Sequence, residues 1–161
     1  MPELSMANDL AELLKAREEI VGVSESSSGG LVSATLLAVP GASVYFLGGG
    51  VIYTVPARQA LLDIEREAVR GMRSASEPYA LLCARTIRDK LGATWGLAET
   101  GAAGPTGNGY GDDPGHTCIA VAGPIERAIT LETGDDDREA NMWAFTKAAL
   151  NLLHDCMKEK G

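Results

Sequence analysis

The sequence has few aromatic residues, three cysteines, two histidines and no long apolar run. Because a bilayer-spanning helix needs about 20 apolar residues, no transmembrane segment is predicted. The cysteines are odd in number and lack CxxC spacing, so Cys83, Cys118 and Cys156 are interpreted as reduced core residues. His116 and His154 lie on different predicted elements. The sequence therefore predicts neither a disulfide framework nor a metal site.

Basic residues are also scarce, with 14 lysines and arginines against 22 acidic residues and a formal net charge of −8. This charge repels polyanions and anionic membrane surfaces, so neither nucleic acid nor a membrane is expected as a partner. A small phosphorylated ligand stays possible, because backbone N–H groups of a glycine-rich turn can hold one phosphate. The first residues lack the basic stretch and apolar core of a secretory signal, and we expect a cytoplasmic location.

Hydrophobic periodicity predicts strands that alternate with helices and end in a hairpin. This order favours a single α/β domain over residues 1–161, with a mixed sheet between two helix layers, a three-layer α/β/α arrangement. The irregular stretch from Thr100 to Gly115 is long for a compact domain and indicates a functional loop. The predicted helices cover residues 5–18, 31–39, 76–92 and 137–158, with another opened by Pro56; the strands cover 20–24, 51–54, 94–99, 116–122 and 127–133.

Two segments could carry chemistry. The turn from Glu25 to Gly30 offers three hydroxyls and several N–H groups at a helix start, which suits either anion binding or helix capping. The loop from Gly101 to Gly111 could let a backbone approach a ligand closely, or could be a mobile surface loop. It is neither a P-loop nor a dinucleotide fingerprint. No Ser/His/Asp arrangement can be argued from spacing.

Several motifs in order resemble the CinA C-terminal domain family over nearly the whole chain, in its free-standing form. They are Glu25-Ser26-Ser27-Ser28-Gly29-Gly30, Pro40-Gly41-Ala42-Ser43 with Tyr45-Phe46, Gly50-Val51-Ile52-Tyr53-Thr54, Ser76-Glu77 and Thr100-Gly101-Ala102-Ala103-Gly104-Pro105. The resemblance implies hydrolysis of the carboxamide of nicotinamide mononucleotide to nicotinic acid mononucleotide and ammonia, in pyridine nucleotide recycling. It implies no cofactor, a small phosphorylated substrate, and a homodimer or higher homo-oligomer.

The resemblance also implies roles for individual residues. Ser43 matches the serine nucleophile, and Tyr53 a hydroxyl that passes or orients a proton. Ser26 and Ser28 match the serine/threonine pair of the family's first turn. The implied substrate-binding residues are Glu25, Ser26, Ser28, Gly29, Gly30, Thr100, Gly101, Gly104 and Arg138.

The chain departs from the family pattern where the family has a lysine thought to activate the nucleophile, because Arg58 stands there. Arginine stays protonated and has no acceptor, so Arg58 can hold an anion or stabilise an oxyanion but cannot take a proton. In addition, Asn141, Met142 and Trp143 stand where the family carries further arginines. Two functions stay open: an amidohydrolase in which another group moves the proton, and a catalytically silent protein that binds a nucleotide or anion through Arg58.

Overall fold

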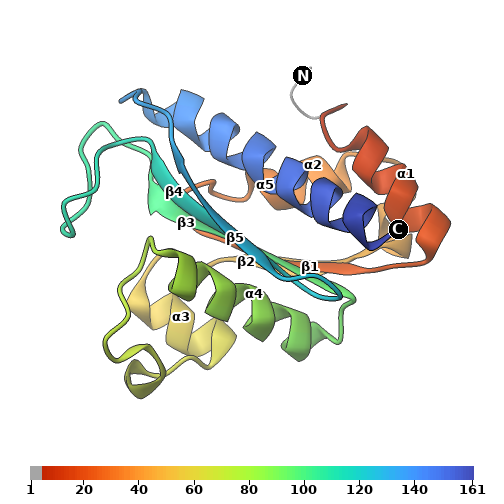
Figure 1. Cartoon of the computed structure of the whole chain (residues 1–161), viewed down its shortest axis with the longest axis horizontal. Helices are drawn as coiled ribbons and strands as arrows, with labels where there is room; N and C mark the ends of the chain where they lie inside the picture. Colours follow the sequence, from red (N-terminus) through yellow and green to blue (C-terminus); the bar gives the residue numbers. More distant parts are fainter. Residues whose placement is uncertain (1–4) are drawn as a thin grey trace.

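The computed structural model describes residues 5–161, which form a five-stranded sheet between two layers of helices (Figure 1). The expected three-layer α/β/α arrangement is confirmed. The strands are β1 (Val21–Glu25), β2 (Phe46–Val51), β3 (Trp95–Ala102), β4 (His116–Ala122) and β5 (Arg127–Glu132). The helices are α1 (Asn8–Arg17), α2 (Leu31–Leu37), α3 (Val55–Leu62), α4 (Glu77–Leu91) and α5 (Arg138–Lys160), with short 3-10 turns at Ala42–Val44 and Arg66–Val69.

The sheet is mixed, with strand order β2-β1-β3-β4-β5. β1 pairs in parallel with both β2 and β3, whereas β3, β4 and β5 pair antiparallel. The carboxyl ends of β1, β2 and β3 therefore meet at one edge of the sheet. The expected hairpin of the last two strands is confirmed.

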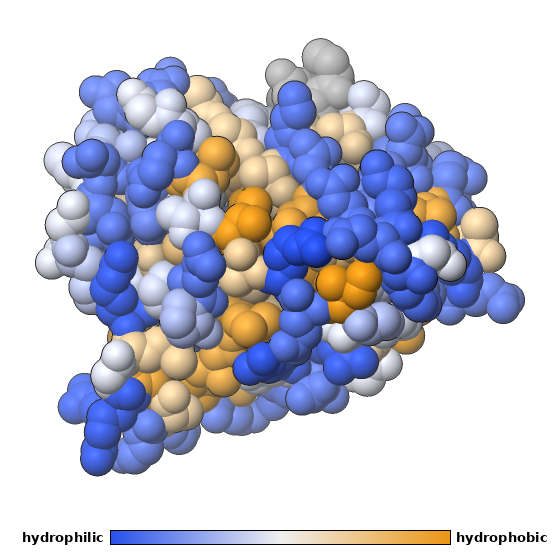
Figure 2. Space-filling view, viewed as in Figure 1, coloured by the Kyte–Doolittle hydropathy of each residue, from blue (hydrophilic) through white to orange (hydrophobic). Residues whose placement is uncertain are grey.

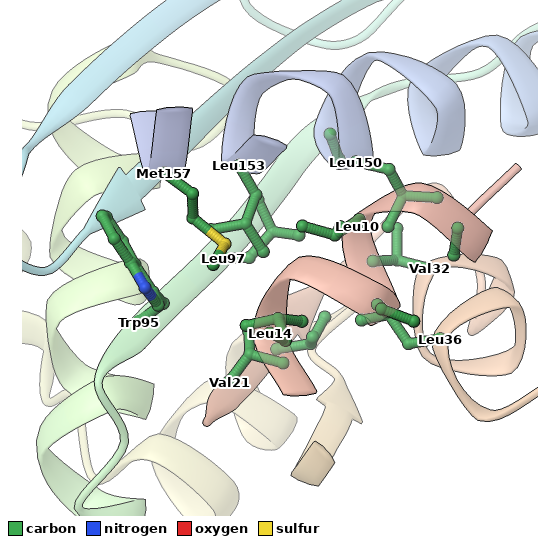
Figure 3. Packing of buried hydrophobic residues seen from close by; sticks show 14 of the residues in the cluster. Leu10, Leu14, Val21, Val32, Leu36, Trp95, Leu97, Leu150, Leu153 and Met157 are labelled. Carbon is green, nitrogen blue, oxygen red and sulfur yellow. The ribbon is translucent and has the colours of Figure 1, made fainter. Parts of the chain in front are cut away.

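Each face of the sheet has its own hydrophobic core. Helices α1, α2 and α5 cover one face, and α3 and α4 cover the other (Figure 1). The larger core lies under α5, where side chains of α1, β1, α2, β3 and α5 meet in a closely packed cluster (Figure 3). Its labelled members are Leu10, Leu14, Val21, Val32, Leu36, Trp95, Leu97, Leu150, Leu153 and Met157.

The surface reflects this layering. In the view of Figure 2, apolar residues gather in a band between the two helix layers, whereas the outer surfaces of the helices are mostly hydrophilic. Cys83, Cys118 and Cys156 are buried and unpaired, which confirms the interpretation of them as reduced core residues.

The strand predicted over residues 51–54 is wrong. The structure places β2 at Phe46–Val51, so that the three consecutive glycines lie inside the strand instead of leading into it. Gly49 pairs with Val23 of β1, and a Cβ at position 49 would lie 2.7 Å from Ser33 Oγ and 3.2 Å from Val23 Cβ. Residues without side chains are needed here because α2 packs close to the sheet.

The helix boundaries follow ordinary capping chemistry. The predicted N-cap Ser76 is confirmed, since its hydroxyl accepts a hydrogen bond from Tyr79 N, and α4 ends at Gly92 with a positive φ. Thr54 caps α3 by accepting from Ala57 N, so this residue begins a helix instead of ending a strand. Asp137 caps α5 through Ala140 N.

Candidate functional site

A pocket of about 310 Å³ opens at the edge where β1, β2 and β3 end. We call it the first lobe. Polar side chains dominate its lining, and none of its lining residues is Lys, His, Asp or Glu. The lining consists of Ser26, Ile52, Tyr53, Thr54, Val55, Arg58, Ser74, Ala75, Tyr79, Thr100, Gly101, Asn108 and Tyr110.

A second lobe of about 230 Å³ adjoins the first and shares Tyr53, Gly101 and Asn108 with it. Backbone of the glycine-rich loop forms much of its wall, as expected for a loop that lets a ligand approach closely. Its remaining lining residues are Ser27, Ala102, Ala103, Gly104, Thr106, Gly107 and Arg138. The two lobes together form an elongated cleft with an arginine in each.

Arg58 lies on α3 in the wall of the first lobe and is only 6% exposed. Its Nε donates to the carbonyl of Ile64 over 3.3 Å. Within residues 5–161, no carboxylate oxygen lies within 4.0 Å of its guanidinium nitrogens. A buried charge without a counter-ion is costly, so Arg58 gives the first lobe an unsatisfied affinity for anions.

Tyr79 and Cys83 of α4 lie beside Arg58. Burial raises the pKa of Tyr79 and raises that of the Cys83 thiol to about 11, while the Arg58 charge acts in the opposite direction on both. Both groups therefore stay protonated at neutral pH. Neither supplies the negative charge that would neutralise Arg58.

Arg138, at the start of α5, lines the second lobe and contacts Tyr53 there. Its Nη2 donates to the Tyr53 hydroxyl over 3.1 Å, and its Nη1 donates to the carbonyl of Gly104. Asn141, one turn later, donates to the carbonyls of Ala103 (2.7 Å) and Asp135 (2.8 Å). Asn141 thus ties the segment that follows β3 to α5.

The turn from Glu25 to Gly30 uses its N–H groups inside the protein. The Glu25 side chain is 1% exposed and accepts four hydrogen bonds, from the Ser28 hydroxyl and the backbone N–H groups of Gly30, Val32 and Ser33. Glu25 therefore caps α2 at the end that the helix dipole makes positive.

A second buried carboxylate holds the same turn. Glu99 of β3 accepts five hydrogen bonds: from Ser26 N, Ser28 N, and the hydroxyls of Ser27, Ser28 and Thr117. The turn was predicted either to bind an anion or to cap a helix. Its N–H groups serve capping, because carboxylates of the protein accept their hydrogen bonds. Ser26 differs from Ser28 and Gly29, because Ser26 lines the first lobe.

The structure brings Ser26, Tyr53 and Arg58 together in the first lobe, which Thr100 and Gly101 also line. It does not bring Ser43 to them. Ser43 lies in the 3-10 turn before β2, whereas Tyr53 follows β2, and a six-residue strand separates its ends by roughly 17 Å. Ser43 lines neither lobe, so its role as nucleophile stays a prediction.

Sequence reasoning missed several residues of the cleft and of the turn beside it. Glu99 is the clearest, because a carboxylate within an otherwise apolar buried strand signals a buried polar contact. Asn108 and Tyr110 lie in the long irregular stretch from Thr100 to Gly115, of which only Thr100, Gly101 and Gly104 were predicted to bind the substrate. Ser74 and Tyr79 reach the first lobe only through tertiary packing.

No group of three or more metal-ligating side chains is found within residues 5–161. In the same part of the chain, no helix has both the length and the hydrophobicity to cross a membrane.

Residues 3–157 match the family model for the CinA C-terminal domain. A CinA-like protein of Prochlorococcus marinus (strain MIT 9313) is 42% identical over 120 residues, which are 74% of this chain and 28% of that protein. A CinA-like protein of Anaeromyxobacter sp. (strain K) is 39% identical over 155 residues, 95% of this chain and 36% of that protein. The chain thus spans about a third of the length of these relatives.

Solved structures share the fold. A CinA superfamily protein of Klebsiella pneumoniae superimposes with a TM-score of 0.91 at 22% identity, with 98% of each chain covered. A CinA superfamily protein of Escherichia coli gives 0.88 at 21% identity, covering 95% of this chain and 90% of that one. The matched family model covers nearly the whole sequence, the two relatives named above are 42% and 39% identical to it, and the fold is the same. The chain belongs to the CinA C-terminal domain family.

Proposed function

We propose that this chain hydrolyses the carboxamide of a pyridine mononucleotide such as nicotinamide mononucleotide. The observation that carries the proposal is the convergence in one pocket of Ser26, from the turn after β1, with Tyr53 and Arg58, from the segment that leads from β2 into α3. A carboxamide needs a nucleophile and a group that stabilises the oxyanion, and this trio offers both. The proposal applies to the described chain alone, which is shorter than its relatives.

Ser26 is the nucleophile that best fits the cleft. Its backbone N–H is fixed by Glu99 at 3.0 Å, and within residues 5–161 no protein group hydrogen-bonds its Oγ. Its hydroxyl is thus positioned and available to a ligand. Ser43, the serine indicated by resemblance, would have to reach the cleft from elsewhere, so the two serines make different predictions.

The proposed reaction has two steps. Ser26 Oγ attacks the carboxamide carbon, Arg58 stabilises the oxyanion, and ammonia leaves with the proton that Ser26 gives up. Water then hydrolyses the acyl ester, releasing the carboxylate and returning the proton to Ser26. Since Arg58 cannot accept a proton, Tyr53 or a water must carry it between these groups.

The second lobe suits the substrate's phosphate. Arg138 supplies a guanidinium there, and Thr106, which carries a hydroxyl, lines the same space. Guanidinium groups bind phosphate through charge-assisted hydrogen bonds. We therefore place the carboxamide near Arg58 and the phosphate near Arg138.

Ammonia release from nicotinamide mononucleotide tests the proposal. Wild type should release ammonia, Ser26→Ala should lose at least a hundredfold in rate, and Ser43→Ala should keep the wild-type rate. Loss of activity in Ser43→Ala with retention in Ser26→Ala would transfer the role to Ser43. No release by folded wild type would refute hydrolysis of this substrate.

A second candidate is an anion-binding protein without turnover. It is favoured by the buried, unpaired guanidinium of Arg58 and by the absence of Lys, His, Asp and Glu from the lining of both lobes. This candidate predicts that nicotinic acid mononucleotide stabilises the protein without being changed, by about 2.7 kcal/mol at a concentration of 100 Kd. Arg58→Lys separates the candidates: a rise in ammonia release would show that the missing base limits catalysis.

A further inference from the structure

The first lobe contains both exposed tyrosines of the chain. Tyr53 is 59% exposed and Tyr110 is 54% exposed, and both line this lobe. The other two tyrosines, Tyr45 and Tyr79, are buried. Aromatic rings left open inside a pocket are surfaces on which a planar ligand ring can stack.

Tyr110 is held at the tip of a turn with its own internal ties. Asn108 Oδ1 accepts hydrogen bonds from the backbone N–H groups of Tyr110 (2.9 Å) and Asp112 (3.2 Å). Asn108 Nδ2 donates to Asp112 Oδ2 over 2.8 Å. The backbone that carries the Tyr110 ring is therefore fixed by its neighbours.

Arg73 holds this turn from a distant segment. Its Nη1 and Nη2 donate to the two carboxylate oxygens of Asp112 over 2.6 and 3.1 Å, the bidentate geometry that makes such pairs strong. The same guanidinium lies over the Tyr110 ring, with Cζ 5.2 Å from the ring centroid. This distance is within the range of a cation–π contact.

Asp112 has a further neighbour. His116 Nε2 lies 3.5 Å from Asp112 Oδ2, and His116 also bonds Ala75, which lines the first lobe. The turn is thereby linked a second time to the segment that carries Arg73, because Ala75 lies two residues after Arg73. Arg73 occupies one side of the Tyr110 ring, and more than half of the residue stays exposed.

We propose that Tyr110, held by Arg73 and Asp112, is the platform on which the planar heteroaromatic ring of a mononucleotide stacks. The platform proposal rests on the proposed function only in that the ligand enters the same cleft, formed by the two lobes. The ligand class is a ring-bearing ribonucleoside monophosphate, with the phosphate in the second lobe. Tyr110 is a specificity-determining residue and Arg73 a positioning residue that acts through it.

Titration calorimetry with three probes tests this inference: nicotinamide mononucleotide, uridine monophosphate and ribose 5-phosphate, which lacks a ring. Wild type should bind at least one ring-bearing probe about tenfold or more tightly than ribose 5-phosphate. Tyr110→Ala should remove that preference while leaving the affinity for ribose 5-phosphate unchanged, and Tyr110→Phe should keep it. Stacking of a base on an aromatic side chain has effects of this size.

Arg73→Ala should weaken the ring-bearing probes and spare ribose 5-phosphate. Arg85→Ala is the matched control, because Arg85 makes a similar two-bond contact with Glu126 (2.8 and 2.5 Å) and lines neither lobe. It should bind all three probes like wild type.

The inference is overturned if Tyr110→Ala keeps the ring preference, if it weakens all probes equally, or if wild type shows no preference for a ring. These outcomes are separate from those of the ammonia assay. Ring preference that depends on Tyr110 without ammonia release would refute the hydrolase and support the platform. Ammonia release from a Tyr110→Ala protein with unchanged KM would support the hydrolase and refute the platform.

Discussion

Glu99 Oε1 accepts hydrogen bonds from both the backbone N–H and the hydroxyl of Ser28, each over 2.8 Å, although 71 residues separate the two in the chain. β3 thereby fixes the turn that carries Ser26. The candidate nucleophile owes its position to a carboxylate that lines neither lobe but accepts hydrogen bonds from Ser26 and Ser27, which do line them.

Replacing Glu99 should therefore damage both stability and the site. In Glu99→Leu, buried donors of Ser26, Ser27, Ser28 and Thr117 lose their acceptor, and we expect the free energy of unfolding to fall by about 3 kcal/mol or more. Urea unfolding measures this loss. Glu126→Leu, at an exposed carboxylate, should change stability by about 0.5 kcal/mol or less, and an equal loss in the two variants would contradict this role for Glu99.

Arg58→Met should separate stability from function. Removing a buried charge that lacks a counter-ion should raise the free energy of unfolding by about 1 kcal/mol, while the variant loses stabilisation by nicotinic acid mononucleotide. Thermal melts with and without this ligand give both quantities. A less stable Arg58→Met protein would indicate that the guanidinium contributes structure beyond its bond to Ile64.

His116 should make stability depend on pH. Its Nδ1 lies 2.5 Å from Glu132 Oε1 and its Nε2 2.8 Å from the Ala75 carbonyl, with Asp112 3.5 Å away, so the doubly protonated ring satisfies every neighbour. Burial lowers its pKa, but the hydrogen bonds to Glu132 and Ala75 and the Asp112 charge raise it, and the net shift is upward.

Because the folded pKa is raised, this stabilisation is fully present below the unfolded pKa of about 6.5 and is lost as pH rises through the folded value. Urea unfolding at a series of pH values should show the loss in wild type and a flatter profile in Glu132→Gln. His154→Gln, which leaves His116 and its neighbours intact, should keep the wild-type profile. Stability that increases over this window would refute the assignment to His116.

Gly96→Ala should destabilise the protein by about 2–3 kcal/mol, because α4 packs directly on β3 at this point. A Cβ at position 96 would overlap the Ala84 carbonyl oxygen and lie 2.8 Å from Arg88 Cβ. Gly109→Ala is the matched control, since nothing lies within 4 Å of its Cβ, and it should change stability by less than about 0.5 kcal/mol. Similar melting temperatures for the two variants would show that α4 can shift.

Local signals in the sequence predicted much of the fold. Ser76 and Gly92 delimit α4 as expected, and the glycine and proline between β4 and β5 mark the hairpin. The error at β2 arose because Gly48, Gly49 and Gly50 look like a turn, and only the closeness of α2 and β1 explains why a strand needs them.

The candidate site was less predictable, because its residues are grouped by sheet topology. Tyr53, Arg58 and Arg138 were chosen by resemblance, and the structure places all three in the cleft. A carboxylate in an apolar strand marks Glu99 as a buried polar residue, but only its tertiary contacts show that it holds the turn that carries Ser26. Tyr110 carries no local motif, and only tertiary contacts identify it. The placement of Ser43 before β2 depends on which end of that strand faces the cleft, which the motif does not encode.

The hydrogen bonds of Glu99 to the turn from Glu25 to Gly30 also affect how the protein unfolds. Ser26 and Ser28 donate their amide protons to a side chain of β3, so these protons can exchange with solvent only when the turn separates from the middle of the sheet. The turn that carries Ser26 therefore opens only together with the sheet beneath it. A substitution far from the cleft that loosens the sheet would also diminish ligand binding.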